Sequence, residues 1–124
     1  MNESQTTAKI NRYLPPEVYA WKIHDSYHRG IPDCYYSGPS GDLWIEFKHY
    51  PAGIPGVFKP RLTEHQIQWL NARHDEGRRV AVVVTDAKHA LVITDKQWNT
   101  RVTRTTTYTH KELATYIAEK VCAC

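Results

Sequence analysis

Two carboxylates and a lysine are spaced so that neighbouring strands would bring them together. Asp33 ends the segment Gly-Ile-Pro-Asp (30–33), and Glu46 and Lys48 lie two residues apart later in the chain. Side chains two residues apart in a strand share a face, so Glu46 and Lys48 should point the same way. Carboxylate oxygens suit Mg²⁺ or Mn²⁺, and a lysine beside them suits an anionic substrate. These residue types therefore indicate metal-assisted cleavage of a phosphodiester.

The residues between these groups predict a β-hairpin. Residues 37–41 read Ser-Gly-Pro-Ser-Gly, which is typical of a turn, and apolar runs flank it on both sides. We expect strands near 32–36 and 42–48. Asp33 then lies at the start of the first strand, at the end of the small sheet where the second strand carries Glu46 and Lys48.

Each acidic residue also has an ordinary structural explanation. Asp33 could cap a turn after Pro32, and Glu46 could face solvent. Burying two carboxylates and a lysine near one another is unfavourable without a metal or mutual pairing, which favours a metal site. We interpret Asp33 and Glu46 as ligands of one or two divalent cations, with the backbone carbonyl of Phe47 as a further ligand. Lys48 would orient or help deprotonate the attacking water, or stabilise the charge that develops on the phosphate.

Capping signals and apolar periodicity predict the other elements. Helices are expected to begin at three capping boxes: Asn2 with Gln5, Thr63 with Gln66, and Thr109 with Glu112. Further strands are expected near 18–24, at 80–84, where a continuous apolar run indicates burial on both faces, and at 90–93. Residues 51–60 are expected to form a proline-rich loop, and 103–107 receive no assignment.

Length and composition limit the class of protein. A chain of 124 residues with 41% hydrophobic residues predicts one domain, 1–124, with a real core. The net charge of +3 permits nucleic-acid binding without establishing it. No apolar run is long enough to span a membrane, the N-terminus lacks signal-peptide features, and three cysteines show no disulfide spacing. We therefore expect a cytoplasmic protein with no membrane partner.

Several basic residues bracket the proposed site in sequence. For any one of them the alternative is ordinary solvated surface. As a group they could follow a phosphate backbone, and they are our candidates for nucleic-acid binding: Lys22, His28, Arg29, His49, Lys59 and Arg61.

An ordered set of segments resembles the PD-(D/E)xK nuclease superfamily, and within it the virus-type replication and repair nuclease (VRR-nuc) domain. The Asp and Glu-x-Lys residues alone form a short pattern with many false matches, but the ordered combination is much more specific. It covers roughly residues 3–85: Trp-Lys-Ile-His (21–24), Gly-Ile-Pro-Asp (30–33), Ile-Glu-Phe-Lys (45–48), Leu-Thr-Glu-His-Gln (62–66), Gly77 and the valine strand 80–84.

The resemblance implies an α/β, restriction-endonuclease-like fold. Its αβββαβ core has a mixed central sheet flanked by helices, here followed by a C-terminal helix. It also implies a Mg²⁺- or Mn²⁺-dependent DNA endonuclease, with Glu3 as the first-helix glutamate near the metals and Gln66 as the glutamine that reaches the active site. Since Gln66 also fits the capping box with Thr63, we expect that one side chain cannot fill both roles at once.

Stand-alone domains that this chain resembles, of phage or bacterial origin, are homodimeric resolvases of four-way (Holliday) DNA junctions. The small size favours that form, because a two-fold dimer can place paired sites on two strands of a symmetric junction. The alternatives are a nicking, flap or other structure-specific endonuclease, and a DNA-binding module of the same fold that does not cut. The proline-rich loop at 51–60 departs from the family pattern, and no motif matches the residues after about 95.

Overall fold

A mixed six-stranded sheet forms the centre of the computed structural model, which describes residues 1–24 and 29–122. Its strand order is β1-β2-β3-β5-β6-β8, and all neighbours are antiparallel except β3 and β5. The strands are β1 (Tyr19–Lys22), β2 (Cys34–Gly38), β3 (Gly41–His49), β5 (Val80–Thr85), β6 (His89–Ile93) and β8 (Tyr108–Thr109). Two short strands, β4 (Val57–Phe58) and β7 (Val102–Thr103), pair separately.

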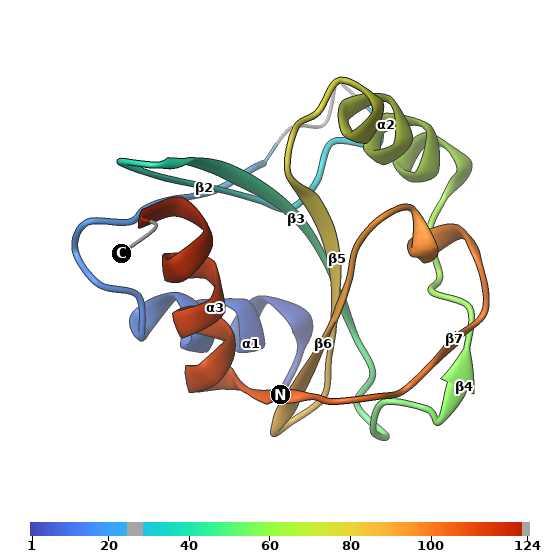
Figure 1. The fold of residues 1–124 in the computed structure, drawn as a ribbon. Coiled ribbons are helices and arrows are strands. Elements are labelled where there is room, and N and C mark those ends of the chain that lie inside the picture. The colour runs from blue at the N-terminus through green and yellow to red at the C-terminus, as the bar shows by residue number, and fades with distance from the viewer. Residues whose placement is uncertain (25–28, 123–124) are drawn as a thin grey trace.

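Helices lie on both sides of this sheet (Figure 1). They are α1 (Glu3–Arg12), α2 (Glu64–Asp75) and α3 (His110–Cys122), with a short 3-10 turn at Gln97–Asn99. The helices α1 and α3 pack together on one face, and α2 lies on the other side (Figure 1). In the part of the chain that the structure describes, no helix is long and apolar enough to cross a bilayer.

The alternation of side chains along β3 decides what faces each layer. Leu43, Ile45 and Phe47 are buried in the core cluster under α1 and α3. Their neighbours Trp44 and Glu46 therefore point to the opposite face. Strand β5, which pairs with β3, is buried along its whole length, as its continuous apolar sequence predicts.

The restriction-endonuclease-like fold and its αβββαβ order are confirmed. The three capping boxes also form as expected, around α1, α2 and α3. The expectation of an unpaired loop at 51–60 is wrong in part, because Val57 and Phe58 pair with Thr103 and Val102. The unassigned stretch 103–107 connects β7 to β8.

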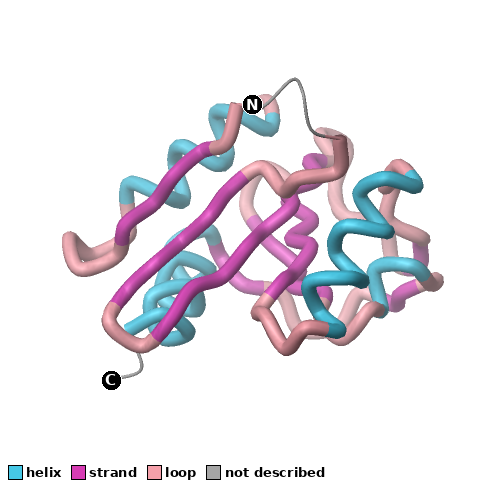
Figure 2. The backbone as a smooth tube through the Cα atoms, turned by 90° about the horizontal axis from the view of Figure 1, so that it is seen from above, coloured by secondary structure: helices cyan, strands magenta, loops and turns pink. Residues whose placement is uncertain are grey.

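The sheet is covered unequally. Seen from above, strands β1, β2 and β3 run side by side with no helix in front of them, and α2 stands beside them (Figure 2). The candidate catalytic residues lie where this open part of the sheet meets α2, since Glu46 of β3 contacts Gln66 of α2.

Candidate active site

The site lies where the pairing between β2 and β3 stops. The last opposed pair is Cys34 with Ile45. One step further, the Asp33 carboxylate takes the place of a backbone partner, because its Oδ2 accepts the N–H of Phe47 at 3.0 Å. In an antiparallel pair, the N–H and C=O of one residue face the same neighbour. The Phe47 carbonyl is therefore directed to the same opening as its N–H.

Glu46 is the buried centre of the site, with 2% of its surface exposed. Its Oε2 accepts from Gln66 Nε2 at 3.0 Å and lies 3.4 Å from Lys48 Nζ. Its Oε1 is buried and meets no donor among the described residues. Burial, and then the charge of Asp33, raise the pKa of Glu46 from 4.5 to about 8, although Lys48 opposes the shift. The expectation that Glu46 and Lys48 share a face agrees with their contact.

Gln66 does two things at once. Its Oε1 accepts the backbone N–H of Thr63 at 2.9 Å, which completes the capping box of α2. Its Nε2 simultaneously donates to Glu46. The expectation that one side chain cannot fill both roles is therefore wrong. The amide group has an acceptor at one atom and a donor at the other, so it can serve the helix and the carboxylate together.

Gly30 allows α2 to reach this position. Its φ is +87°, and a Cβ at this position would lie 2.2 Å from the backbone oxygen of His65. Only glycine tolerates both this conformation and this approach. Gly30 thus packs directly on the first turn of α2, close to the residues through which Asp33 bonds to Phe47 and Gln66 bonds to Glu46.

Glu3 approaches the site from the start of α1. The helix begins there because Asn2 and Gln5 cap one another. Burial raises the pKa of Glu3 from 4.5 to about 7, helped by the charge of Asp33 and a side-chain hydrogen bond with it, while Lys48 and Lys22 oppose the shift. Glu3 therefore lies close enough to Asp33 for their charges to interact.

Lys22 reaches the same end of α1, where its Nζ donates to Ser4 Oγ at 3.2 Å. Sequence reasoning missed Ser4. The contact joins residues 18 apart on a strand and a helix, and no local pattern signals it.

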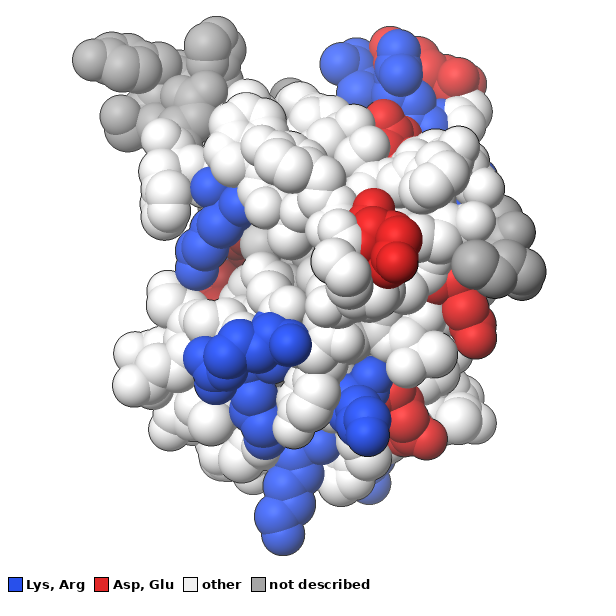
Figure 3. Space-filling model, turned by 90° about the vertical axis from the view of Figure 1, so that its left-hand side faces the viewer, with Lys and Arg blue, Asp and Glu red and all other residues white. Residues whose placement is uncertain are grey.

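The other residues proposed to contact DNA differ in their exposure and their local contacts. Arg29, Lys59 and Arg61 are exposed, and the Arg61 guanidinium lies 4.7 Å from the ring centroid of Tyr50, just after β3. His49 is half-buried, with Nδ1 2.9 Å from the Thr85 hydroxyl. His28 lies outside the described residues. On the face drawn in Figure 3, several basic side chains gather toward the lower left, and acidic side chains lie beside them and higher on the same face.

The carboxylates do not by themselves form a closed metal cage. Within residues 1–24 and 29–122, no three His, Cys, Asp or Glu side chains are arranged to hold a metal ion. What the structure does provide is a set of hard oxygen donors of the kind that Mg²⁺ and Mn²⁺ prefer. They are the free Glu46 oxygen, the Asp33 carboxylate and the Phe47 carbonyl, with Glu3 nearby.

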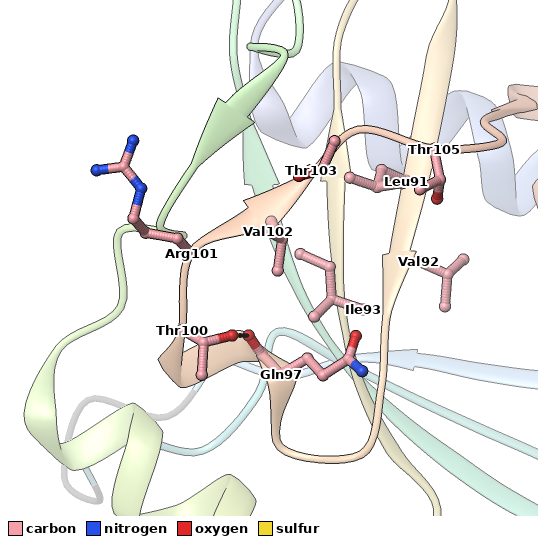
Figure 4. Close-up of a pocket in the computed structure, with 9 residues that line it drawn as sticks. All are labelled: Leu91, Val92, Ile93, Gln97, Thr100, Arg101, Val102, Thr103 and Thr105. Carbon is pink, nitrogen blue, oxygen red and sulfur yellow. Dashed lines mark hydrogen bonds between the residues drawn. The ribbon is translucent and has the colours of Figure 1, made fainter.

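A separate cavity elsewhere contains none of these residues. It lies beside β6 and the segment that follows it (Figure 4), and it lacks acidic side chains. Its lining residues are Leu91, Val92, Ile93, Gln97, Thr100, Arg101, Val102, Thr103 and Thr105. With no carboxylate or lysine in its wall, this cavity is a poor candidate for phosphodiester chemistry.

Comparisons with known proteins find the fold in a solved structure. No protein-family model matches the chain, and no curated protein does. The structure of Archaeoglobus fulgidus Hjc, a Holliday junction resolvase from an archaeal hyperthermophile, is similar, with a TM-score of 0.53 and 14% sequence identity. The match covers 90% of this chain and 99% of that chain. At this identity the likeness shows the fold alone, which is restriction-endonuclease-like.

Proposed function

We propose that this chain is a divalent-metal-dependent DNA endonuclease of the VRR-nuc type that hydrolyses phosphodiester bonds in four-way junctions. The observation that carries the proposal is the buried Glu46 carboxylate. It is held between Lys48 and Gln66, next to Asp33, and one of its oxygens has no donor among the described residues. A fold shared with a junction resolvase agrees with this reading.

The donor set suits a Mg²⁺ or Mn²⁺ ion. Asp33, Glu46 and the Phe47 carbonyl would hold it, with Glu3 as a further ligand. Two observations favour this fit: the unpartnered oxygen of Glu46, and the raised pKa values of Glu46 and Glu3, to about 8 and about 7. Both indicate partly or fully buried carboxylates whose negative charge the described residues do not fully stabilise. When bound, the ion polarises the scissile phosphate and lowers the pKa of an attacking water.

The chain's own residues orient the reacting groups. Lys48 Nζ lies 3.4 Å from Glu46, and 22% of its side chain is exposed, so it can contact a phosphate oxygen or the attacking water without leaving the site. Gln66 fixes the Glu46 carboxylate through its amide.

DNA would be held by basic side chains around the site. We propose phosphate contacts for Lys22, His28, Arg29, His49, Lys59 and Arg61. A homodimer would place paired sites on the two strands to be cut. A cytoplasmic location and a phage or bacterial origin accompany this proposal.

The test is cleavage of labelled DNAs of matched sequence: a four-way junction, a flap, a nicked duplex, a plain duplex and a single strand. Each is incubated with Mg²⁺ and then Mn²⁺. The isosteric variants Asp33→Asn and Glu46→Gln should abolish cutting with the fold retained, and the exposed Glu17→Gln should cut normally. Circular dichroism checks the fold of each variant.

The pattern of products distinguishes the alternatives. Paired symmetric cuts in the junction alone support the resolvase. Cutting of flaps, nicks or plain duplex keeps the nuclease and rejects the junction role. Tight junction binding without cutting in either metal rejects the nuclease and leaves a DNA-binding module of the same fold. Cleavage that survives both active-site variants would show that another site does the chemistry.

A further inference from the structure

A row of aromatic side chains crosses the open face of the sheet. Trp21 of β1 is paired with Tyr35 of β2, which is paired with Trp44 of β3. Directly opposed residues share a face of the sheet, so the three rings lie on one side. The ring centroids of Tyr35 and Trp44 are 4.5 Å apart, and those of Trp44 and Trp69 of α2 are 5.2 Å apart. The Tyr35 hydroxyl donates to Asp42 at 2.9 Å, which fixes its ring.

The outer end of this row is open to solvent. Trp21 is 48% exposed, and Tyr19, two residues earlier on the same face, is 62% exposed. Among the residues that the structure describes, no helix lies over β1 and β2 in the view from above (Figure 2). Sequence reasoning missed this surface, because it treated Trp21 and Trp69 as parts of separate apolar elements. Adjoining exposed aromatic side chains of this size mark a binding surface.

The row runs into the candidate active site. Glu46 follows Trp44 by two residues on the same face, a rise of about 7 Å along the strand. Lys48 follows next, and its Nζ contacts Glu46. At the α2 end, the Arg73 guanidinium lies 5.5 Å from the Trp69 ring centroid. Planar apolar surface flanked by cations fits a ligand that has both flat rings and negative charge.

We propose that this aromatic row, comprising Tyr19, Trp21, Tyr35, Trp44 and Trp69, stacks against DNA bases whose faces are exposed next to the scissile phosphate. Such bases are unpaired nucleotides, or the terminal base pairs at a branch point. A continuous duplex hides its base faces, so the row selects branched DNA over duplex. Stacking tolerates any sequence, since every base has a π-face. This inference rests on the proposed function and locates its substrate selectivity on β1.

The test compares Trp21→Ala and Trp21→Phe with Tyr13→Ala. Tyr13 is an equally exposed aromatic residue (47%), but it lines a groove with α3 away from the row. For binding, all variants are made in a Glu46→Gln background, so that it is measured without cutting; for cleavage, the same variants are made with Glu46 intact. The probes are a four-way junction, a flap and a plain duplex, each with 2-aminopurine, whose fluorescence is quenched by stacking, at or near the branch position.

Trp21→Ala should weaken junction or flap binding by on the order of 5- to 100-fold, the value of one stacked base, and leave duplex binding within about twofold. It should also remove the quenching of 2-aminopurine. Trp21→Phe should keep most of the affinity for branched DNA and most of the quenching. Tyr13→Ala should change neither quantity. The salt dependence of binding should keep its slope, because no phosphate contact is lost.

Equal losses on branched and duplex DNA, or no loss on either, would overturn the proposal. So would sedimentation showing that Trp21→Ala turns a dimer into a monomer while the quenching persists, since the row would then join two copies of the chain. If stacking depends on Trp21 but the protein with Glu46 intact cuts no DNA, the proposed nuclease function is rejected and the role of the aromatic row is kept. If the chain with Glu46 intact cuts branched DNA equally well with and without Trp21→Ala, only the role of the aromatic row is rejected.

Discussion

Glu46→Gln should make the metal-free protein more stable in alkaline solution while it abolishes the proposed activity. Burial and the charge of Asp33 raise the pKa of Glu46 from 4.5 to about 8 in the folded chain. At pH values between these two pKa values, the folded state binds more protons than the unfolded state. The free energy of unfolding therefore falls as the pH rises through this range. The carboxylate is fully ionised in both states only above pH 8. There, the ionised carboxylate lowers the free energy of unfolding by its full amount.

The magnitude follows from the size of the shift. At ~1.4 kcal/mol per pKa unit, a rise from 4.5 to about 8 corresponds to on the order of 5 kcal/mol. The favourable charge of Lys48 is already included in this shift, so glutamine removes a net cost of this size, less the cost of burying its own amide. We therefore expect a net gain of about 2–3 kcal/mol for Glu46→Gln at pH 9, and a much smaller difference at pH 5.

Urea unfolding of both proteins in EDTA at pH 5, 7 and 9 measures this difference. The exposed Glu17→Gln is the matched control and should stay within about 0.5 kcal/mol of the wild type throughout. If Glu46→Gln is no more stable than the wild type at pH 9, or if the difference is the same at pH 5, the reasoning is refuted. Adding Mg²⁺ should then stabilise the wild type and leave Glu46→Gln unchanged.

Substitutions at Lys48, Gln66 and Gly30, with Thr63→Ala for comparison, test single parts of the site. Lys48→Ala should lower the single-turnover cleavage rate by on the order of 100-fold with DNA affinity little changed; a loss confined to affinity would make Lys48 a phosphate contact. Gln66→Ala should lower the free energy of unfolding in urea by about 2–3 kcal/mol, because this variant loses both the helix cap and the bond to Glu46. Thr63→Ala should lower it by only about 1 kcal/mol. Equal losses would argue against the bond between Gln66 and Glu46. Gly30→Ala should lower stability by about 2 kcal/mol or more, since its Cβ would meet the His65 oxygen at 2.2 Å; unchanged thermal unfolding would contradict this packing.

Local patterns were enough to predict the parts of the fold that depend on local chemistry. The capping pairs are set by residues three apart, so α1, α2 and α3 begin where the sequence indicates. The period of two along β3 placed Glu46 and Lys48 on one face, and the valine run predicted burial of β5. Each of these features needs only the neighbours of a residue in the chain.

Features that join distant segments could not be predicted in this way. The two simultaneous contacts of Gln66 could not be predicted, because nothing in residues 62–66 shows that α2 lies over β3. The pairing of Val57 with Thr103 joins residues far apart in a proline-rich loop and a polar stretch. The aromatic row depends on the register of three strands, and that register is fixed only when β1 pairs with β2.

The site exists because the sheet stops pairing at one point and α2 fills the opening. If β2 continued along β3, Phe47 would bond to a backbone partner, and its N–H would not be available to the Asp33 carboxylate. If α2 lay further away, Glu46 would lose its amide donor and Gly30 would lose the reason for its left-handed conformation. The point where β2 stops pairing with β3 therefore frees the backbone of Phe47 for Asp33, and it is also where α2 approaches Glu46. A substitution that moved Asp33 away from Phe47, or one that pushed α2 away from β3, should abolish the proposed cleavage without changing Glu46 or Lys48.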